Sequence, residues 1–223
     1  MKKSQYNQKL TPEKAAEGIS AIVSNAHSLI DDAELLYENG RYERATALSI
    51  LAVEEAGKIS IIRSILMEDD QKELSKEWKR FRNHLDKNWG LAFFDSVQQG
   101  RKHFDELKSL LTDEKSKKSF EYLKQLAFYT EFFKNKNWSS PDKVINKDLA
   151  TTILKSAKVF VGDKGSSVST KEELELWVKH LKPVWKKDTN LMKQAVINFY
   201  HEAEEKGVLN GKAKTKNAIE FLL

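Results

Sequence analysis

Residues 38–58 have the sequence ENGRYERATALSILAVEEAGK, and this stretch joins two long helical patterns. In the first pattern, small and apolar residues recur every three or four positions from Ala15 to Leu36, which is the period of one buried helix face. Thr11 is a good N-cap for this helix, and the Asn-Gly pair inside the quoted stretch ends it with a turn. We therefore expect a first helix of about six turns.

The second helix is expected from Tyr42 to about Met67, and so short a connection makes the two helices an antiparallel hairpin. From Ala45 to Leu66 almost every residue is apolar or small, so this helix is expected to be central. Further helical patterns follow at residues 71–89, 103–111, 117–133, 146–161, 170–180 and 188–206, with a loop at 135–142 and a short tail helix at the end. With three prolines and nine glycines, the composition also favours helices over sheets. The sequence predicts an all-α fold.

This all-α chain is expected to divide near Gly162. Residues 1–162 form a helical bundle of four or five helices, and residues 163–223 form a C-terminal helical extension. A linker from Gly162 to Ser169 separates them, and Thr170 with Glu173 makes a capping box that opens the first helix beyond it. The extension either packs against the bundle or forms a small subdomain.

The composition excludes several classes of protein. With 223 residues, no cysteine and a net charge of +5, the chain has no disulfide scaffold, thiolate metal site or cysteine nucleophile. No apolar run approaches the roughly 20 residues that a membrane span needs, and no secretory signal follows the start, so we expect a soluble cytoplasmic protein. No metal-ligand spacing, glycine-rich phosphate loop or dinucleotide fingerprint occurs, so no metal and no cofactor is expected. The mild basicity permits RNA as a partner without arguing for it.

Charged residues interrupt the apolar face of the second helix. Glu55 lies within a core stripe, and Glu54 and Lys58 lie on the neighbouring strip, one turn apart in the favourable order for an ion pair. A buried charge without a partner costs several kcal/mol, so these groups need partners or a water-filled cleft. Gly57 beside them permits another backbone or a ligand to come close. Either a salt bridge with a second, interhelical bond or a functional site explains the pattern.

The third helix carries a complementary basic set. Arg80, His84 and either Lys87 or Asn88 share a face that flanks the core stripe of this helix. A histidine can move a proton near neutral pH, and an arginine is a planar clamp for phosphate. Together they suit cleavage of RNA without a metal, because the histidine handles the proton while the arginine stabilises charge on phosphorus. The alternative is a surface basic helix with an incidental histidine.

Three blocks of sequence carry a resemblance to a known family. They are GRYERA (residues 40–45) with AVEEAGK (52–58), WKRFRNHLDK (78–87), and FYTEF (128–132) followed by WSSP (138–141) and NKDLA (146–150). Over roughly residues 12–162 the chain thus resembles AbiV-type abortive-infection proteins, which belong to the HEPN class of helical bundles. Many HEPN proteins are metal-independent ribonucleases with an Arg-x(4–6)-His motif and a Glu-x-x-x-Lys pair on the preceding helix.

The resemblance implies a fold, an activity and a set of site residues. It implies a HEPN-like bundle and a phage-defence toxin, a metal-independent ribonuclease that halts translation on infection. The implied catalytic residues are His84, Arg80 or Arg82, Glu55, Glu54 and Lys58, and the implied RNA-binding residues are Lys87, Asn83 and Lys79. Only three residues separate Arg80 from His84, and Lys79 stands where a four-residue gap would put the arginine.

The resemblance also bears on partners. HEPN nucleases usually act as dimers with motifs from two chains facing one cleft, so we expect a homodimer that binds RNA. An antitoxin or a phage-encoded activator is a further expected partner. The alternative function is a non-catalytic interaction protein, which blocks translation or binds a phage protein or an antitoxin.

Overall fold

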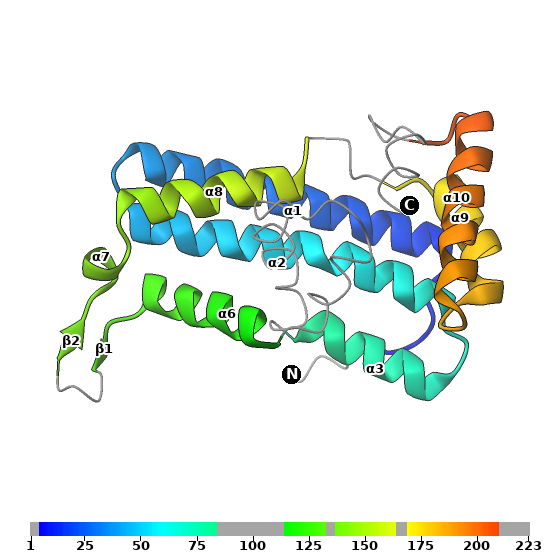
Figure 1. Cartoon of the computed structure of the whole chain (residues 1–223), viewed down its shortest axis with the longest axis horizontal. Coiled ribbons are helices and arrows are strands. Elements are labelled where there is room, and N and C mark those ends of the chain that lie inside the picture. The colour runs from blue at the N-terminus through cyan, green and yellow to red at the C-terminus, as the bar shows by residue number, and fades with distance from the viewer. Residues whose placement is uncertain (1–4, 84–113, 133–136, 164–168, 210–223) are drawn as a thin grey trace. The chain divides into compact units, whose positions relative to one another are not determined.

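The computed structural model describes residues 5–83, 114–132, 137–163 and 169–209, and most of these residues are helical (Figure 1). The helices are α1 (Pro12–Glu38), α2 (Tyr42–Met67), α3 (Gln71–Arg82), α6 (Glu114–Phe128), α7 (Pro141–Val144), α8 (Lys147–Val161), α9 (Lys171–Leu181), the 3₁₀-helix η3 (Lys182–Val184) and α10 (Thr189–Glu205). Two short strands, β1 (Glu131–Phe132) and β2 (Trp138–Ser139), pair antiparallel. The predicted all-α fold is confirmed.

Local sequence determines most of the helix ends. At the start of α1, the Lys14 N–H donates to the Thr11 hydroxyl (3.2 Å), and the chain turns at Gly40 with a φ of 72°. The Asn146 side chain accepts from the Leu149 N–H at the start of α8 (2.9 Å). These are the capping residues that the sequence predicts, because their oxygens satisfy N–H groups that lack a partner inside the helix.

Helix α3 is shorter than predicted. The expected helix continues to residue 89, whereas the structure ends it at Arg82, and Asn83 has extended backbone with φ −83° and ψ 127°. The Asn83 N–H closes the last turn on the carbonyls of Lys79 and Arg80. Asparagine favours such an end because its side chain competes for backbone hydrogen bonds. The predicted continuation of the helix is therefore wrong at Asn83. The face expected for Arg80, His84 and either Lys87 or Asn88 stays a prediction, because His84, Lys87 and Asn88 lie outside the described residues.

Two smaller expectations also need correction. The helix expected at 117–133 ends at Phe128, and β1 follows it. The loop expected at 135–142 contains β2 and the start of α7. The expected helix at 103–111 and the tail helix lie outside the described residues.

The chain forms two compact units, and α1 and α2 contribute to both. The first consists of residues 1–21, 58–83 and 165–223, and the second of residues 22–57 and 84–164. The predicted boundary between a bundle and an extension at residue 162 stays a prediction.

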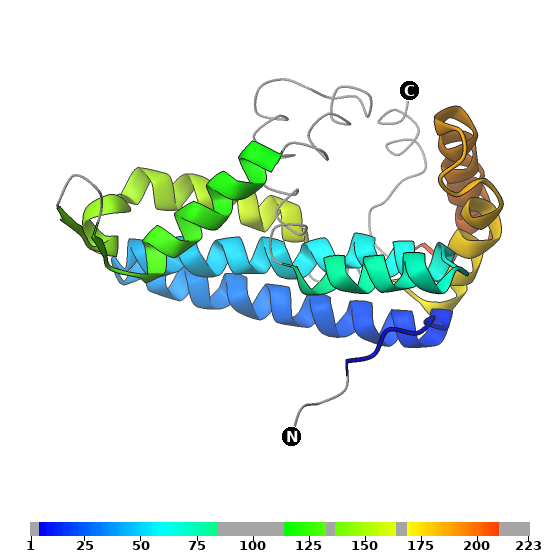
Figure 2. The ribbon, with the colours of Figure 1, turned by 90° about the horizontal axis from the view of Figure 1, so that it is seen from below.

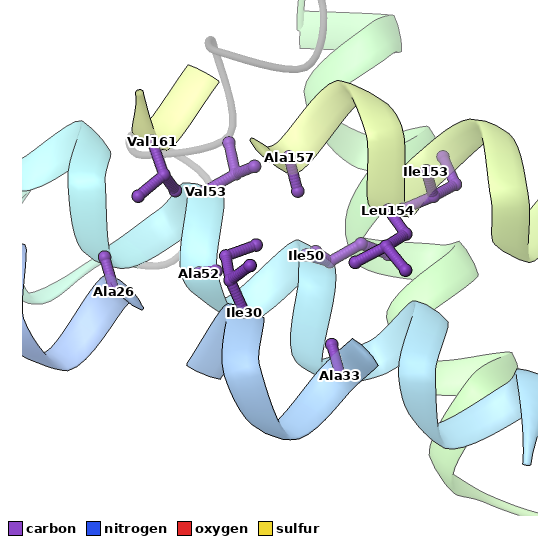
Figure 3. Close-up of a cluster of buried hydrophobic side chains, with 10 residues drawn as sticks. All are labelled: Ala26, Ile30, Ala33, Ile50, Ala52, Val53, Ile153, Leu154, Ala157 and Val161. Carbon is purple, nitrogen blue, oxygen red and sulfur yellow. The ribbon is translucent and has the colours of Figure 1, made fainter. Parts of the chain in front are cut away.

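The second unit has its core between α1, α2 and α8 (Figure 3). Small residues such as Ala33, Ala52 and Ala157 let the helices approach closely, and Ile50 and Leu154 fill the space between them. The Tyr37 hydroxyl lies 2.6 Å from the Thr151 hydroxyl and adds a polar tie between α1 and α8. This core supports the acidic middle of α2.

The first unit packs the end of α2 against α3. Its apolar cluster joins Ile61 and Ile65 to Leu74 and Trp78, and the Trp78 indole N–H donates to the Gln8 carbonyl (2.9 Å). In the same unit α9 and α10 pack side by side, with the ring centroids of Trp177 and Phe199 5.2 Å apart (Figure 2). Among the residues described, we find no helix whose length and apolar character suffice to cross a membrane.

Candidate functional site

The acidic middle of α2 contains a buried ion pair. The Glu54 carboxylate lies 2.6 Å from the Lys124 ammonium, which comes from α6, and the two side chains are 4% and 7% exposed. The Glu121 carboxylate lies 2.7 Å from the same ammonium. Glu54 is thus bound by a cation that lies 70 positions further along the chain.

The environment of Lys124 keeps it charged. Burial lowers the pKa of Lys124, but the carboxylates of Glu121 and Glu54 outweigh this effect and raise the pKa above its ordinary value. A protonated Lys124 balances the buried charge of Glu54. The pair therefore has the character of a structural link between α2 and α6.

Sequence reasoning missed Lys124, although the sequence contains a signal. Lys124 belongs to the spacing Phe120, Leu123, Lys124, Ala127, which is one face of a helix, and this face is otherwise apolar. A lysine inside such a face needs an acidic partner in the interior. Glu54 and Glu55 interrupt the apolar face of α2 in the same way.

Glu55 and Lys58 lie on either side of the buried Gly57 and are both half-buried. The Lys58 ammonium lies 5.4 Å from the centroid of the Phe81 ring, a cation–π contact that links α2 to α3 in the first unit. Glu54 and Glu55 belong to the second unit, whereas Lys58, Arg80 and Arg82 belong to the first. The expected meeting of the acidic and basic sets stays a prediction.

The basic end of α3 holds its two arginines differently. The Arg80 guanidinium makes a salt bridge of 2.6 Å with Glu77, and its side chain is 44% exposed while that of Glu77 is 6% exposed. Arg82 donates to the carbonyls of Trp78 (3.2 Å) and Tyr6, and its guanidinium lies 5.4 Å from the Trp78 ring centroid. Arg82 is thus tied to the N-terminal segment, and Arg80 has the guanidinium that solvent reaches more freely.

Exposed groups surround Arg80 on the same last turn. Lys79 and Asn83 are both exposed, and Lys79, Arg80 and Arg82 together place three cations at the C-terminal end of α3. Cations are favoured there because the helix dipole is negative at this end. The arrangement can hold an anion such as a phosphate through Arg80 and Lys79. Within the described part of the chain, no group of three His, Asp or Glu residues is suited to hold a metal ion.

Comparison with known proteins agrees with this architecture. A family model, HEPN_AbiV, described as AbiV, matches residues 14–162, from the first turn of α1 to the glycine that ends α8. The protein is therefore a helical protein of the HEPN class. Since the match covers well over half of its length, the chain belongs to the AbiV family of abortive-infection proteins. No curated protein and no solved structure matches it.

The matched region contains all of the predicted site residues and also Lys124. Helices α9 and α10 lie beyond it. The family comparison therefore says nothing about the role of α9 and α10.

Proposed function

We propose that this protein is a phage-defence toxin and a metal-independent endoribonuclease that halts translation on infection. Membership of the AbiV family supports the role in abortive infection. The observation that carries the nuclease activity is the exposed Arg80 guanidinium at the end of α3, four positions before His84. We expect the protein to act in the cytoplasm on RNA, and an antitoxin or a phage-encoded activator controls it.

The proposed chemistry needs only protein side chains. His84 removes the proton from a ribose 2′-OH, and that oxygen attacks the adjacent phosphorus. The bond from phosphorus to the 5′-oxygen breaks, this oxygen takes up a proton, and the products end in a 2′,3′-cyclic phosphate and a 5′-hydroxyl. Arg80 stabilises the charge that builds on the phosphoryl oxygens. In a homodimer, a second His84 is available to donate the proton to the leaving oxygen.

The other predicted site residues take supporting parts. Lys79, Asn83 and Lys87 bind the RNA backbone, and Lys58 adds positive charge. Glu55 orients the histidine. Glu54, held by Lys124, contributes through the stability of the bundle, and Arg82 contributes through its hold on the N-terminal segment.

The test compares His84→Ala with His201→Ala, which removes an exposed histidine on α10. Removal of the acid/base is expected to lower RNA cleavage by about 10²–10⁴-fold and to abolish growth arrest, whereas His201→Ala behaves as wild type. The readout is the sequencing of RNA 3′ ends from expressing cells, with circular dichroism to show that both variants fold. Full toxicity and cyclic-phosphate ends in a folded His84→Ala protein would overturn the proposal.

One observation favours the alternative, a non-catalytic interaction protein. Trp138 on β2 is 70% exposed, and its ring centroid lies 5.0 Å from that of Phe132 on β1, which is also exposed. This hairpin follows α6 in the second unit (Figure 1). Exposed aromatic pairs are frequent anchors of protein interfaces. Intact RNA together with halted translation, and loss of toxicity in Trp138→Ala but not in His84→Ala, would favour this function.

A further inference from the structure

The turn between η3 and α10 carries a lysine with an unusual backbone. Lys186 has a φ of 56°, the one positive value of a non-glycine residue in the described ranges. Lysine rarely adopts this left-handed conformation, which glycine and asparagine tolerate better. Trp185 precedes it and donates its indole N–H to Glu68 (2.7 Å). The turn therefore holds Lys186 in place against its backbone preference.

The Lys186 ammonium lies over a row of carboxylates on and before α3. It is 2.5 Å from Glu68, 3.3 Å from Glu73 and 3.8 Å from Glu77. All four residues belong to the first unit. One cation from beyond the family-matched region thus lies beside three carboxylates, and one of them, Glu77, is next to the basic end of α3.

Glu77 is the point where this lysine and Arg80 meet. Lys186 lies nearest to the Oε1 oxygen of the Glu77 carboxylate, while Arg80 binds the Oε2 oxygen at 2.6 Å. The carboxylate is buried and both cations are substantially exposed. A buried carboxylate that loses every cation is strongly destabilised, but one that keeps a cation is not. Lys186, whose nearest carboxylate is Glu68, is a second cation 3.8 Å from Glu77, so Glu77 would keep a cation if Arg80 left it.

We propose that Lys186 is a positioning residue for RNA: it retains the charge balance of Glu77 and so frees the Arg80 guanidinium to bind phosphate. This proposal rests on the proposed function, since it assigns Arg80 to the RNA backbone. It gives the C-terminal extension a part in substrate binding. Arg80 contacts Glu77 in the presence of Lys186, but this carboxylate keeps a cation if RNA draws Arg80 away. Without Lys186, the same movement would cost Glu77 both cations, so RNA competes less well for the guanidinium.

The first test measures RNA binding and cleavage for Lys186→Met. We expect the affinity for a labelled single-stranded RNA, measured by anisotropy in a His84→Ala background, to fall about tenfold. In the protein that keeps His84, the KM for RNA cleavage is expected to rise by a similar factor, while kcat is expected to stay at its wild-type value. Lys182→Met is the matched control, because Lys182 comes from the same segment but contacts Asp69 (2.7 Å) and not Glu77. Lys186→Arg is expected to keep wild-type binding.

The second test is a rescue. Glu77→Gln in the Lys186→Met background removes the carboxylate that captures Arg80, so RNA affinity is expected to return towards the wild-type value. Lys186→Gly serves as a second variant, because glycine relieves the positive φ while it removes the ammonium. Wild-type RNA affinity in folded Lys186→Met and Lys186→Gly proteins, or no rescue by Glu77→Gln, would overturn the proposal.

A stability measurement tests whether Lys186 and Arg80 share Glu77 independently of the proposed ribonuclease activity. If Lys186 and Arg80 share Glu77, the double variant Lys186→Met/Arg80→Ala loses more stability in urea than the sum of the single variants. Additive losses would contradict the shared carboxylate and with it the proposal. A wild-type chain that neither binds nor cuts RNA would refute the proposed function and the positioning role together, while the coupling between the two cations would persist.

Discussion

Two ion pairs, one in each unit, use the same chemistry in different surroundings. Glu54 and Lys124 are both almost fully buried, and Lys124 also contacts the less buried carboxylate of Glu121. Glu77 is equally buried, but its partner Arg80 is 44% exposed and a second cation, Lys186, lies nearby. Loss of a cation therefore has different consequences at the two places. We expect the first pair to stabilise the fold, and we propose that the second leaves Arg80 available for another anion.

The largest loss of stability is expected when the buried Glu54–Lys124 pair is broken. Lys124→Met leaves the Glu54 carboxylate in the interior without this cation, so the free energy of unfolding falls by about 3–5 kcal/mol. Urea denaturation measures this loss. Lys155→Met removes an exposed lysine of α8 and serves as the control, with a change expected within about 0.5 kcal/mol.

A double variant sharpens the same point. Glu54→Leu combined with Lys124→Met replaces both charges by apolar side chains, and most of the lost stability is expected to return. A double variant that is as unstable as Lys124→Met would show that the loss comes from packing and not from the uncompensated carboxylate.

An intermediate effect is expected at a third pair, which joins α2 to α9. The Arg63 guanidinium lies 2.8 Å from both the Glu173 carboxylate and the Ser169 hydroxyl, and it stacks 5.0 Å from the Trp177 ring centroid. Because Arg63 is only partly buried, Arg63→Met is expected to lower the free energy of unfolding by about 1.5–3 kcal/mol. Urea denaturation followed by tryptophan fluorescence tests it, and a loss equal to that of Lys124→Met would contradict the ranking by burial.

A smaller effect is expected at the exposed partner of Glu77. Arg80→Ala leaves Lys186 beside Glu77, so the free energy of unfolding is expected to fall by less than about 1 kcal/mol. Thermal and urea denaturation measure the change, with Arg44→Ala, an exposed arginine of α2, as the control. A loss of several kcal/mol would mean that Arg80 is structural.

The smallest expected effect is a change in stability at acidic pH, where Asp69 becomes protonated. Hydrogen bonds and charges from Lys182 and Lys9 lower the pKa of Asp69 to about 2 from its ordinary 3.8. A carboxyl whose folded pKa is depressed stabilises the fold above its unfolded pKa, and this contribution is lost as pH falls from about 4 to about 2. Asp69 is exposed, so only a slight decrease is expected. Asp69→Asn should flatten this part of the stability profile, and an unchanged profile would contradict the assignment.

The buried face of α1 and the starts of several helices were predictable because local sequence determines them. The period of the apolar residues from Ala15 to Leu36 indicates which face of α1 is buried, and capping at Thr11, Asn146 and Thr170 indicates where helices begin. The end of α3 was not predicted, since the apolar period continues through Leu85 while the backbone leaves the helix at Asn83.

The partners of the charged residues were less predictable. Glu54 and Lys58 have the right spacing for a pair within one helix, but the lysine that lies 2.6 Å from Glu54 comes from α6. Which lysine of α6 faces α2 depends on how the helices pack, and local spacing does not contain that information. The same holds for Lys186, whose partners on α3 lie more than 100 positions before it.

The most direct test of the account compares the two ion pairs in one cleavage assay. The rate of cleavage of a single-stranded RNA, with a chelator present, is measured for Arg80→Ala and for Glu54→Leu/Lys124→Met, each corrected for its folded fraction. We predict that Arg80→Ala loses at least about 100-fold in rate with little loss of stability, whereas the buried double variant cuts RNA nearly as fast as wild type. If Glu54→Leu/Lys124→Met folds but does not cut RNA, while Arg80→Ala cuts RNA as fast as wild type, the assignment of a structural role to the buried pair and a catalytic role to Arg80 is contradicted.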